Sequence, residues 1–142
     1  MNRAAWQQLA EERIRDAEAL LNAQRWSGAY YLAGYAVECG LKSCILVRVA
    51  ASPEILFEEQ NKRFSTNCWT HDIEDLVRLA DLEAVRALET TANPLLGWNW
   101  QVVKDWSEKS RYEIKSQVQA EDLVYAVPDR AIGVLPWIMA RW

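Results

Sequence analysis

The sequence predicts an all-α fold, an up-and-down antiparallel helical bundle of about five or six helices. Glycine and proline are scarce, with 5 and 4 in 142 residues, which argues against the many turns of an all-β chain. Apolar residues recur at helical spacing over long segments, most clearly over residues 26–49. A chain of 142 residues is long enough for one hydrophobic core, so we expect a single domain over residues 1–142.

The composition argues against several classes of protein. The apolar fraction is 51%, the charged fraction is 25%, and the net charge of −4 does not favour broad phosphate binding. Three cysteines without paired spacing and a single histidine provide neither a disulfide framework nor a zinc site, so we expect no metal and no cofactor. The first residues contain no apolar signal core, and charged residues interrupt the longest apolar stretch. We therefore expect a cytoplasmic protein without a membrane span.

Eight tryptophans are unusual for a chain of this length. Indole rings bury large areas and are also enriched at interfaces, so their number points to self-association. For any single tryptophan, a place in the core remains the simpler interpretation.

The first two predicted helices cover residues 4–23 and 26–51. Their short connection predicts that they pack antiparallel. We expect Ser27 to cap the second helix, and Pro53 to end it because proline disfavours the α conformation in the residue before it.

The second helix carries two stripes of residues. The polar stripe consists of Tyr31, Tyr35, Glu38 and Lys42, at positions i, i+4, i+7 and i+11 of one face. The small stripe consists of Ala29, Ala33, Ala36 and Gly40, roughly 200° around the axis, where another helix can approach closely. The polar stripe is either an internal network that fixes helix register or one wall of a pocket or dimer seam.

After Pro53 the helical periodicity fades. Residues 54–69 predict a partly ordered loop with one helical turn at residues 53–59. A new helix begins at Thr70-His71-Asp72, where Thr70 or Asp72 can cap it. Asp81 begins another helix that Asn93-Pro94 ends, and a short helix follows within residues 95–106.

The C-terminal part begins with a polar linker over residues 107–115. Ser116 and Gln119 then fit the capping box of a last helix. Proline removes a backbone donor inside a helix, so we expect a kink or restart of this helix at Pro128-Asp129.

Few residues are candidates for chemistry. His71 is the single histidine, and a hydrogen bond at the helix terminus is a better interpretation of it than general-base catalysis. Arg111 and Tyr112, with Lys109 nearby, precede a helix N-terminus, where they either hold a phosphate or belong to a solvated linker. No residue is assigned a catalytic role; Arg111 is the one candidate.

The block A-E-A-L-L-N-A-Q-R-W-S-G-A-Y-Y-L-A-G-Y-A-V-E-C-G-L-K-S, residues 17–43, resembles the HEPN family (higher eukaryotes and prokaryotes nucleotide-binding domain). T-H-D-I-E-D-L at residues 70–76 and Arg111-Tyr112 continue the resemblance in the expected order. The resemblance implies an up-and-down helical bundle that is usually dimeric, so a homodimer is expected.

Many HEPN proteins are metal-independent ribonucleases of toxin–antitoxin or defence systems, with an arginine, four to six intervening residues and then a histidine. Arg111 matches that arginine, but residues 116–118 contain no histidine. General acid–base cleavage then lacks its second titrating group. Other family members pair with a small nucleotidyltransferase or bind nucleotides or RNA without catalysis.

The resulting hypothesis is a non-catalytic HEPN-like protein that binds a nucleotide, RNA or a partner such as a nucleotidyltransferase. Arg111, Tyr112 and Lys109 would contact the phosphate or partner, and the polar stripe would line the adjoining groove. Two alternatives stay open. One is an endoribonuclease with a degenerate motif that uses Arg111 and an unconventional partner such as Tyr112. The other is a purely structural dimeric scaffold.

Overall fold

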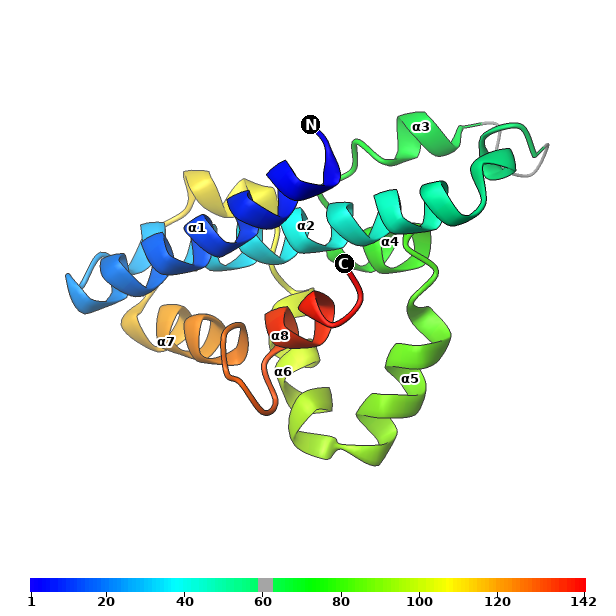
Figure 1. The fold of residues 1–142 in the computed structure, drawn as a ribbon. Coiled ribbons are helices and arrows are strands. Elements are labelled where there is room, and N and C mark those ends of the chain that lie inside the picture. Colours follow the sequence, from blue (N-terminus) through cyan, green and yellow to red (C-terminus); the bar gives the residue numbers. More distant parts are fainter. Residues whose placement is uncertain (59–62) are drawn as a thin grey trace.

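The structure is a computed structural model that describes residues 1–58 and 63–142, and it contains only helices and connecting segments over these residues (Figure 1). The α-helices are α1 Arg3–Asn22, α2 Trp26–Ala51, α3 Phe64–Asn67, α4 Ile73–Leu79, α5 Glu83–Ala92, α6 Pro94–Lys104, α7 Gln117–Ala126 and α8 Val134–Met139. Two 3₁₀ helices, η1 Pro53–Leu56 and η3 Glu108–Tyr112, lie between them. The predicted all-α class is confirmed, whereas the described part holds more helices than expected.

Helices α1 and α2 form the one long antiparallel pair among the described residues, and α4, η3, α7 and α8 pack on α2, whereas α5 packs on α6 (Figure 1). The other helices are short, so the predicted up-and-down arrangement is not confirmed for the chain as a whole. Asn2 caps α1 through its side-chain oxygen, which accepts a hydrogen bond from the Ala5 amide at 2.8 Å. Gln24 adopts a left-handed conformation with φ 59°, which turns the chain tightly into α2.

The prediction that Ser27 caps α2 is wrong. The helix begins one residue earlier, and its N-cap residue Arg25 makes no side-chain capping bond. Ser27 Oγ instead accepts a hydrogen bond from the Lys115 amide at 2.9 Å. The serine therefore ties the segment before α7 to the start of α2.

The small stripe of α2 is a packing face, as its residue sizes predict. Ala29, Ala33 and Ala36 are fully buried. Gly40 lies against α8, where an added Cβ would come within 3.0 Å of Ile138 Cγ2. Small side chains thus let the neighbouring elements approach the backbone of α2 closely.

Between α2 and α5 the chain follows its local signals with three differences. Helix α2 ends before Pro53, and the turn predicted over residues 53–59 is helical only in η1, Pro53–Leu56; residues 59–62 lie outside the described part. The short helix α3 lies within the loop predicted over residues 54–69. Asp72 caps α4 by accepting a hydrogen bond from the Asp75 amide at 2.9 Å. Helix α5 begins at Glu83 rather than at Asp81, because Asp81 takes the left-handed conformation, with φ 60°, that often follows a helix C-terminus.

The C-terminal part confirms the capping box and corrects the linker. Ser116 and Gln119 form both hydrogen bonds of the box at the start of α7. The chain leaves the helix after Ala126 and restarts it at Val134, so the predicted interruption near Pro128 is a full break. The predicted polar linker over residues 107–115 contains the ordered helix η3, which packs on α2.

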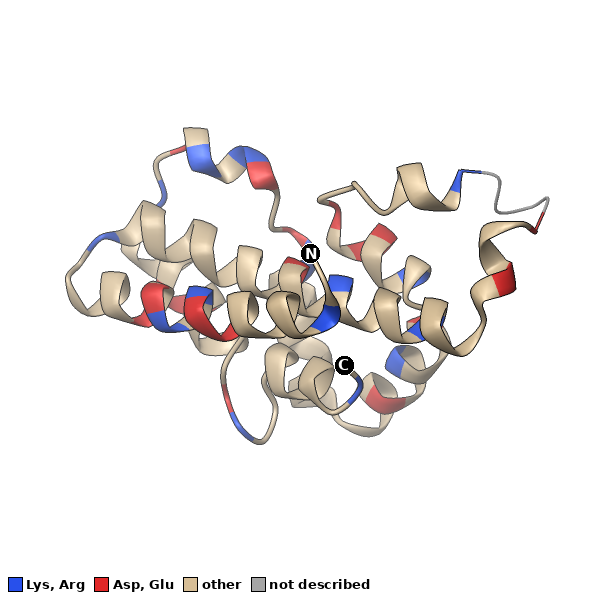
Figure 2. Cartoon of the chain, turned by 45° about the horizontal axis from the view of Figure 1, so that its top comes forward, with Lys and Arg blue, Asp and Glu red and all other residues tan. Residues whose placement is uncertain are grey.

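The eight tryptophans divide into three groups by exposure. Trp100, Trp106 and Trp137 are buried in the core, and Trp6, Trp26 and Trp142 are partly buried. Trp69 and Trp98 are 78% and 72% exposed. Figure 2 shows charged residues of both signs along α1, around η3 and on α4 and α5. In the described residues, no helix is both long and apolar enough to cross a membrane.

Candidate functional site

The polar stripe of α2 is brought against two segments that come later in the chain. One is the turn Thr70–Asp72 before α4, and the other is the stretch from Trp106 through η3. The predicted stripe is therefore part of an interior contact network that also reaches solvent. Tyr31 and Tyr35 are partly buried, and Glu38 is the most deeply buried member of the stripe.

Glu38 and Lys42 form an ion pair inside the protein. Lys42 Nζ lies 2.8 Å from Glu38 Oε1, and the side chains are only 11% and 1% exposed. Burying two charges has a desolvation penalty that their attraction offsets only when both remain paired. The second oxygen of Glu38, Oε2, is buried and has no hydrogen-bond partner among the described residues.

His71 is the second partner of Glu38. Its Nδ1 lies 2.9 Å from Glu38 Oε1, and its Nε2 lies 3.1 Å from Glu108 Oε2 on η3. The expectation of a helix-terminus hydrogen bond for His71 is wrong, because Asp72 caps the helix and the imidazole points across to α2 and η3. This histidine links three elements that are distant in sequence.

The contact with Glu38 defines one hydrogen-bonding role of the imidazole. A carboxylate oxygen only accepts, so Nδ1 donates to Glu38 Oε1. On the other side of the ring, Nε2 faces Glu108 Oε2.

Trp106 covers the first half of α2 beside this network. An added Cβ on Gly34 would lie 2.2 Å from the indole, so only glycine leaves room for the ring here. Tyr31 stacks on Trp106 with a centroid distance of 6.1 Å and on Tyr35 with 6.0 Å. Gly34 thus allows the segment that carries η3 to settle on α2.

Possible nucleophiles in this region are held in their neutral forms. Burial raises the pKa of Tyr35 to about 12 and the pKa of the Cys39 thiol to about 12. Burial likewise raises the pKa of Cys44 to about 12. Because the thiolate is the reactive form of cysteine, these groups are structural rather than nucleophilic.

Helix η3 presents the remaining predicted site residues to solvent. Arg111 and Tyr112 are exposed, and the Arg111 guanidinium lies 4.9 Å from the Tyr112 ring centroid. Lys109 is also exposed. Lys115 is occupied instead, with Nζ 2.6 Å from Glu113 and 4.7 Å from the Tyr30 ring centroid. Among the described residues, Arg111 and Lys109 form no ion pair.

A polar hollow of about 220 Å³ lies between the start of α4 and η3. Its lining consists of Thr70, His71, Asp72, Trp106, Ser107 and Glu108. Within the described ranges, no group of three or more histidine, cysteine or acidic side chains is placed to hold a metal ion. The arrangement can accept hydrogen bonds at its carboxylates and can donate them from His71 and Arg111.

No protein-family model matches this chain, and no curated protein or solved structure is significantly similar to it. The HEPN resemblance therefore rests on the sequence motifs alone and remains a hypothesis.

Proposed function

We propose that this protein binds a phosphate-bearing ligand, a nucleotide or single-stranded RNA, on the face formed by η3 and the first half of α2. In this proposal it acts as a non-catalytic HEPN-like binding protein. The observation that carries the proposal is Arg111, an exposed guanidinium without a carboxylate partner among the described residues. Guanidinium groups are well suited to bidentate contacts with phosphate oxygens.

The surroundings of Arg111 support such a ligand. In a 3₁₀ helix, residues i and i+3 share one side, so Arg111 lies on the same side of η3 as Glu108, which holds His71. Tyr112 is exposed and offers a ring on which a base can stack. Since His71 and Lys115 are already paired with carboxylates, Arg111 and Lys109 are the cations available to an incoming anion.

The test is binding of a fluorescein-labelled single-stranded uridine oligonucleotide, about eight nucleotides long, by fluorescence anisotropy at low salt. Arg111→Ala should weaken binding about tenfold, because a charge-assisted contact is lost. Arg130→Ala is the matched control, since it removes an equally exposed arginine from the loop between α7 and α8. Equal weakening by both variants, or no binding by the unaltered protein, would refute the proposal and favour a scaffold.

A second candidate is a metal-independent endoribonuclease, and the position of His71 favours it. The buried Glu38 carboxylate fixes one imidazole nitrogen, and the other faces Glu108, three residues before Arg111. His71 thus lies against η3, the helix that carries Arg111, and supplies an imidazole that the arginine's own sequence motif lacks. Cleavage of RNA in the presence of a chelator, lost in both His71→Ala and Arg111→Ala, would support this function. Intact RNA with the unaltered protein would exclude it.

The partners of this function are a second copy of the chain and a small nucleotidyltransferase. Large apolar side chains at the surface, such as Phe57 and Trp98, are compatible with an additional interface. Size-exclusion chromatography with light scattering tests the homodimer, and co-purification with a nucleotidyltransferase encoded beside it tests the second partner. A monomer at micromolar concentration would argue against self-association.

A further inference from the structure

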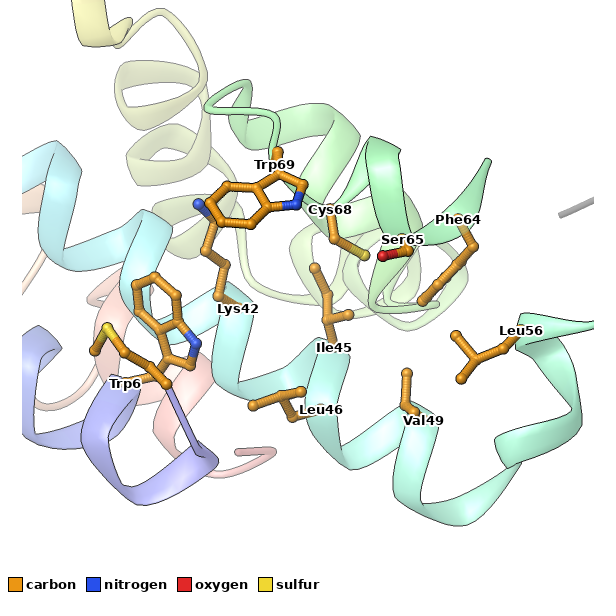
Figure 3. Close-up of a pocket in the computed structure, with 11 residues that line it drawn as sticks. Trp6, Lys42, Ile45, Leu46, Val49, Leu56, Phe64, Ser65, Cys68 and Trp69 are labelled. Carbon is orange, nitrogen blue, oxygen red and sulfur yellow. The ribbon is translucent and has the colours of Figure 1, made fainter. Parts of the chain in front are cut away.

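A second hollow, more apolar than the polar one, lies at the other end of α2. It has a volume of about 330 Å³ and is lined by residues at the start of the chain and of α1, in the second half of α2, in η1, in α3 and in the two residues after α3 (Figure 3). Lys42 on its wall lies eleven residues after Tyr31, or about 16 Å along the helix axis. The pocket and the surface around Arg111 thus lie along different parts of α2, and Lys42 connects the pocket wall to the Glu38 network.

The pocket has a buried floor and an aromatic rim. Ile45 and Phe64 form part of the floor and are themselves buried. Trp6 and Trp69 project into it from α1 and from the segment before α4 (Figure 3). Trp69 is 78% exposed, so most of its indole has no packing partner within the chain. A buried floor distinguishes this pocket from a scattered set of exposed apolar side chains.

The one charged side chain among the described residues of the pocket wall is already paired. Lys42 is the ionisable side chain among the pocket residues, apart from the Cys68 thiol, and its Nζ is paired with Glu38 Oε1 at 2.8 Å. The Trp6 ring also lies beside this ammonium, with its centroid 5.2 Å from Nζ. A paired cation offers little additional attraction to an anion, so the pocket favours uncharged occupants.

We propose that this pocket binds a small molecule containing one neutral planar aromatic ring system, stacked against Trp69. A volume of about 330 Å³ is near the lower limit for small-molecule sites, which fits a single monocyclic or bicyclic ring. The aromatic rim supplies ring faces for stacking, and the buried aliphatic floor supplies apolar contact. This binding site is independent of the phosphate-binding function proposed above.

The chain contains a built-in reporter for the test. It has two methionines: Met1 lines the pocket, and Met139 lies on α8 at a different hollow. Full-length protein with ¹³C-labelled methionine methyl groups is titrated with indole and followed by NMR. We expect a saturable shift of the Met1 methyl signal and no shift of the Met139 signal. Equal shifts of both signals, or no saturable change at Met1, would overturn the proposal.

Two tryptophan variants show where the probe binds. Trp69→Ala should weaken indole binding about tenfold, as expected for loss of a stacking partner. Trp98→Ala removes a tryptophan of similar exposure, 72%, from α6 and should change the affinity less than about twofold. Indole-3-acetate should bind no more tightly than indole, because Lys42 is paired. Unchanged binding by Trp69→Ala would refute the stacking site, and tighter binding of the acetate would refute the neutral ligand class.

Discussion

The two halves of α2 are covered in different ways. The first half carries Gly34, and Trp106 fits against the backbone there, so the segment leading to η3 packs directly on the helix. The second half carries larger side chains, including Ile45 and Val49, and the elements beside it leave a hollow. At Gly34 the absence of a side chain thus allows close coverage, whereas the face of Ile45 and Val49 borders a pocket.

The same comparison holds for charge. Near the end of the first half, Glu38 is paired with Lys42 and contacts His71, whereas the hollow along the second half is mainly apolar. Lys42 stands at the boundary and belongs to both regions. The Glu38–Lys42 ion pair of the first region therefore also positions a side chain in the pocket wall of the second. Substitutions of this pair test how the two regions depend on each other.

Lys42→Met should have the largest effect, because it removes the ammonium that pairs with the buried Glu38 carboxylate and leaves His71 as the remaining hydrogen-bond partner of Glu38. We expect a loss of about 3 kcal/mol in the free energy of unfolding, measured by urea denaturation. Arg15→Met is the matched control, since it breaks an exposed pair with Glu12 and should change stability by less than about 1 kcal/mol.

The double variant Glu38→Gln with Lys42→Met separates charge from packing. Removing both charges should recover a large part of the lost stability, because no unpaired buried carboxylate remains. If Lys42→Met lowers the free energy of unfolding no more than Arg15→Met does, the buried Glu38–Lys42 pair does not stabilise the fold.

Much of the fold could be predicted because the signals for it are local. The periodicity of α1 and α2, the Asp72 cap and the Ser116–Gln119 box involve residues within a few turns of one another. Helix η3 was missed because its position depends on packing against α2, and its own sequence is polar throughout. The Ser27 cap failed for a similar reason, since a distant amide took the hydroxyl.

Only part of the candidate site could be predicted from the sequence. The polar stripe followed from helical spacing, but the contact of His71 with Glu38 joins residues 33 positions apart, and no local pattern encodes it. Gly34 was an available signal: glycine weakens a helix interior, so its presence there indicates a close approach by another element. No local pattern in the sequence predicts a ligand at Arg111, and the anisotropy experiment tests for one.

Gly34→Ala tests the close packing of the first half directly. The new Cβ would lie 2.2 Å from Trp106, so the indole must move, and we expect destabilisation of about 1–2 kcal/mol after the better helix propensity of alanine is included. Gly28→Ala is the control in the same helix, where the Cβ meets only the flexible Leu20 side chain at 3.2 Å. It should be neutral or stabilising by about 0.5–1 kcal/mol. Similar urea midpoints for the two variants would contradict the close fit.

His71→Gln should have the smallest effect on stability, because the histidine side chain is 44% exposed and one of its two contacts is with a half-exposed carboxylate. We expect a loss of no more than about 1 kcal/mol. The change should be local, since His71 joins η3 to the start of α4: amide hydrogen exchange should accelerate in residues 108–112 and stay unchanged in α1. Thr70→Ala, one residue away, leaves both imidazole contacts in place and should not accelerate exchange in η3. Faster exchange in both variants would mean that the turn before α4, rather than the imidazole, holds η3 against α2.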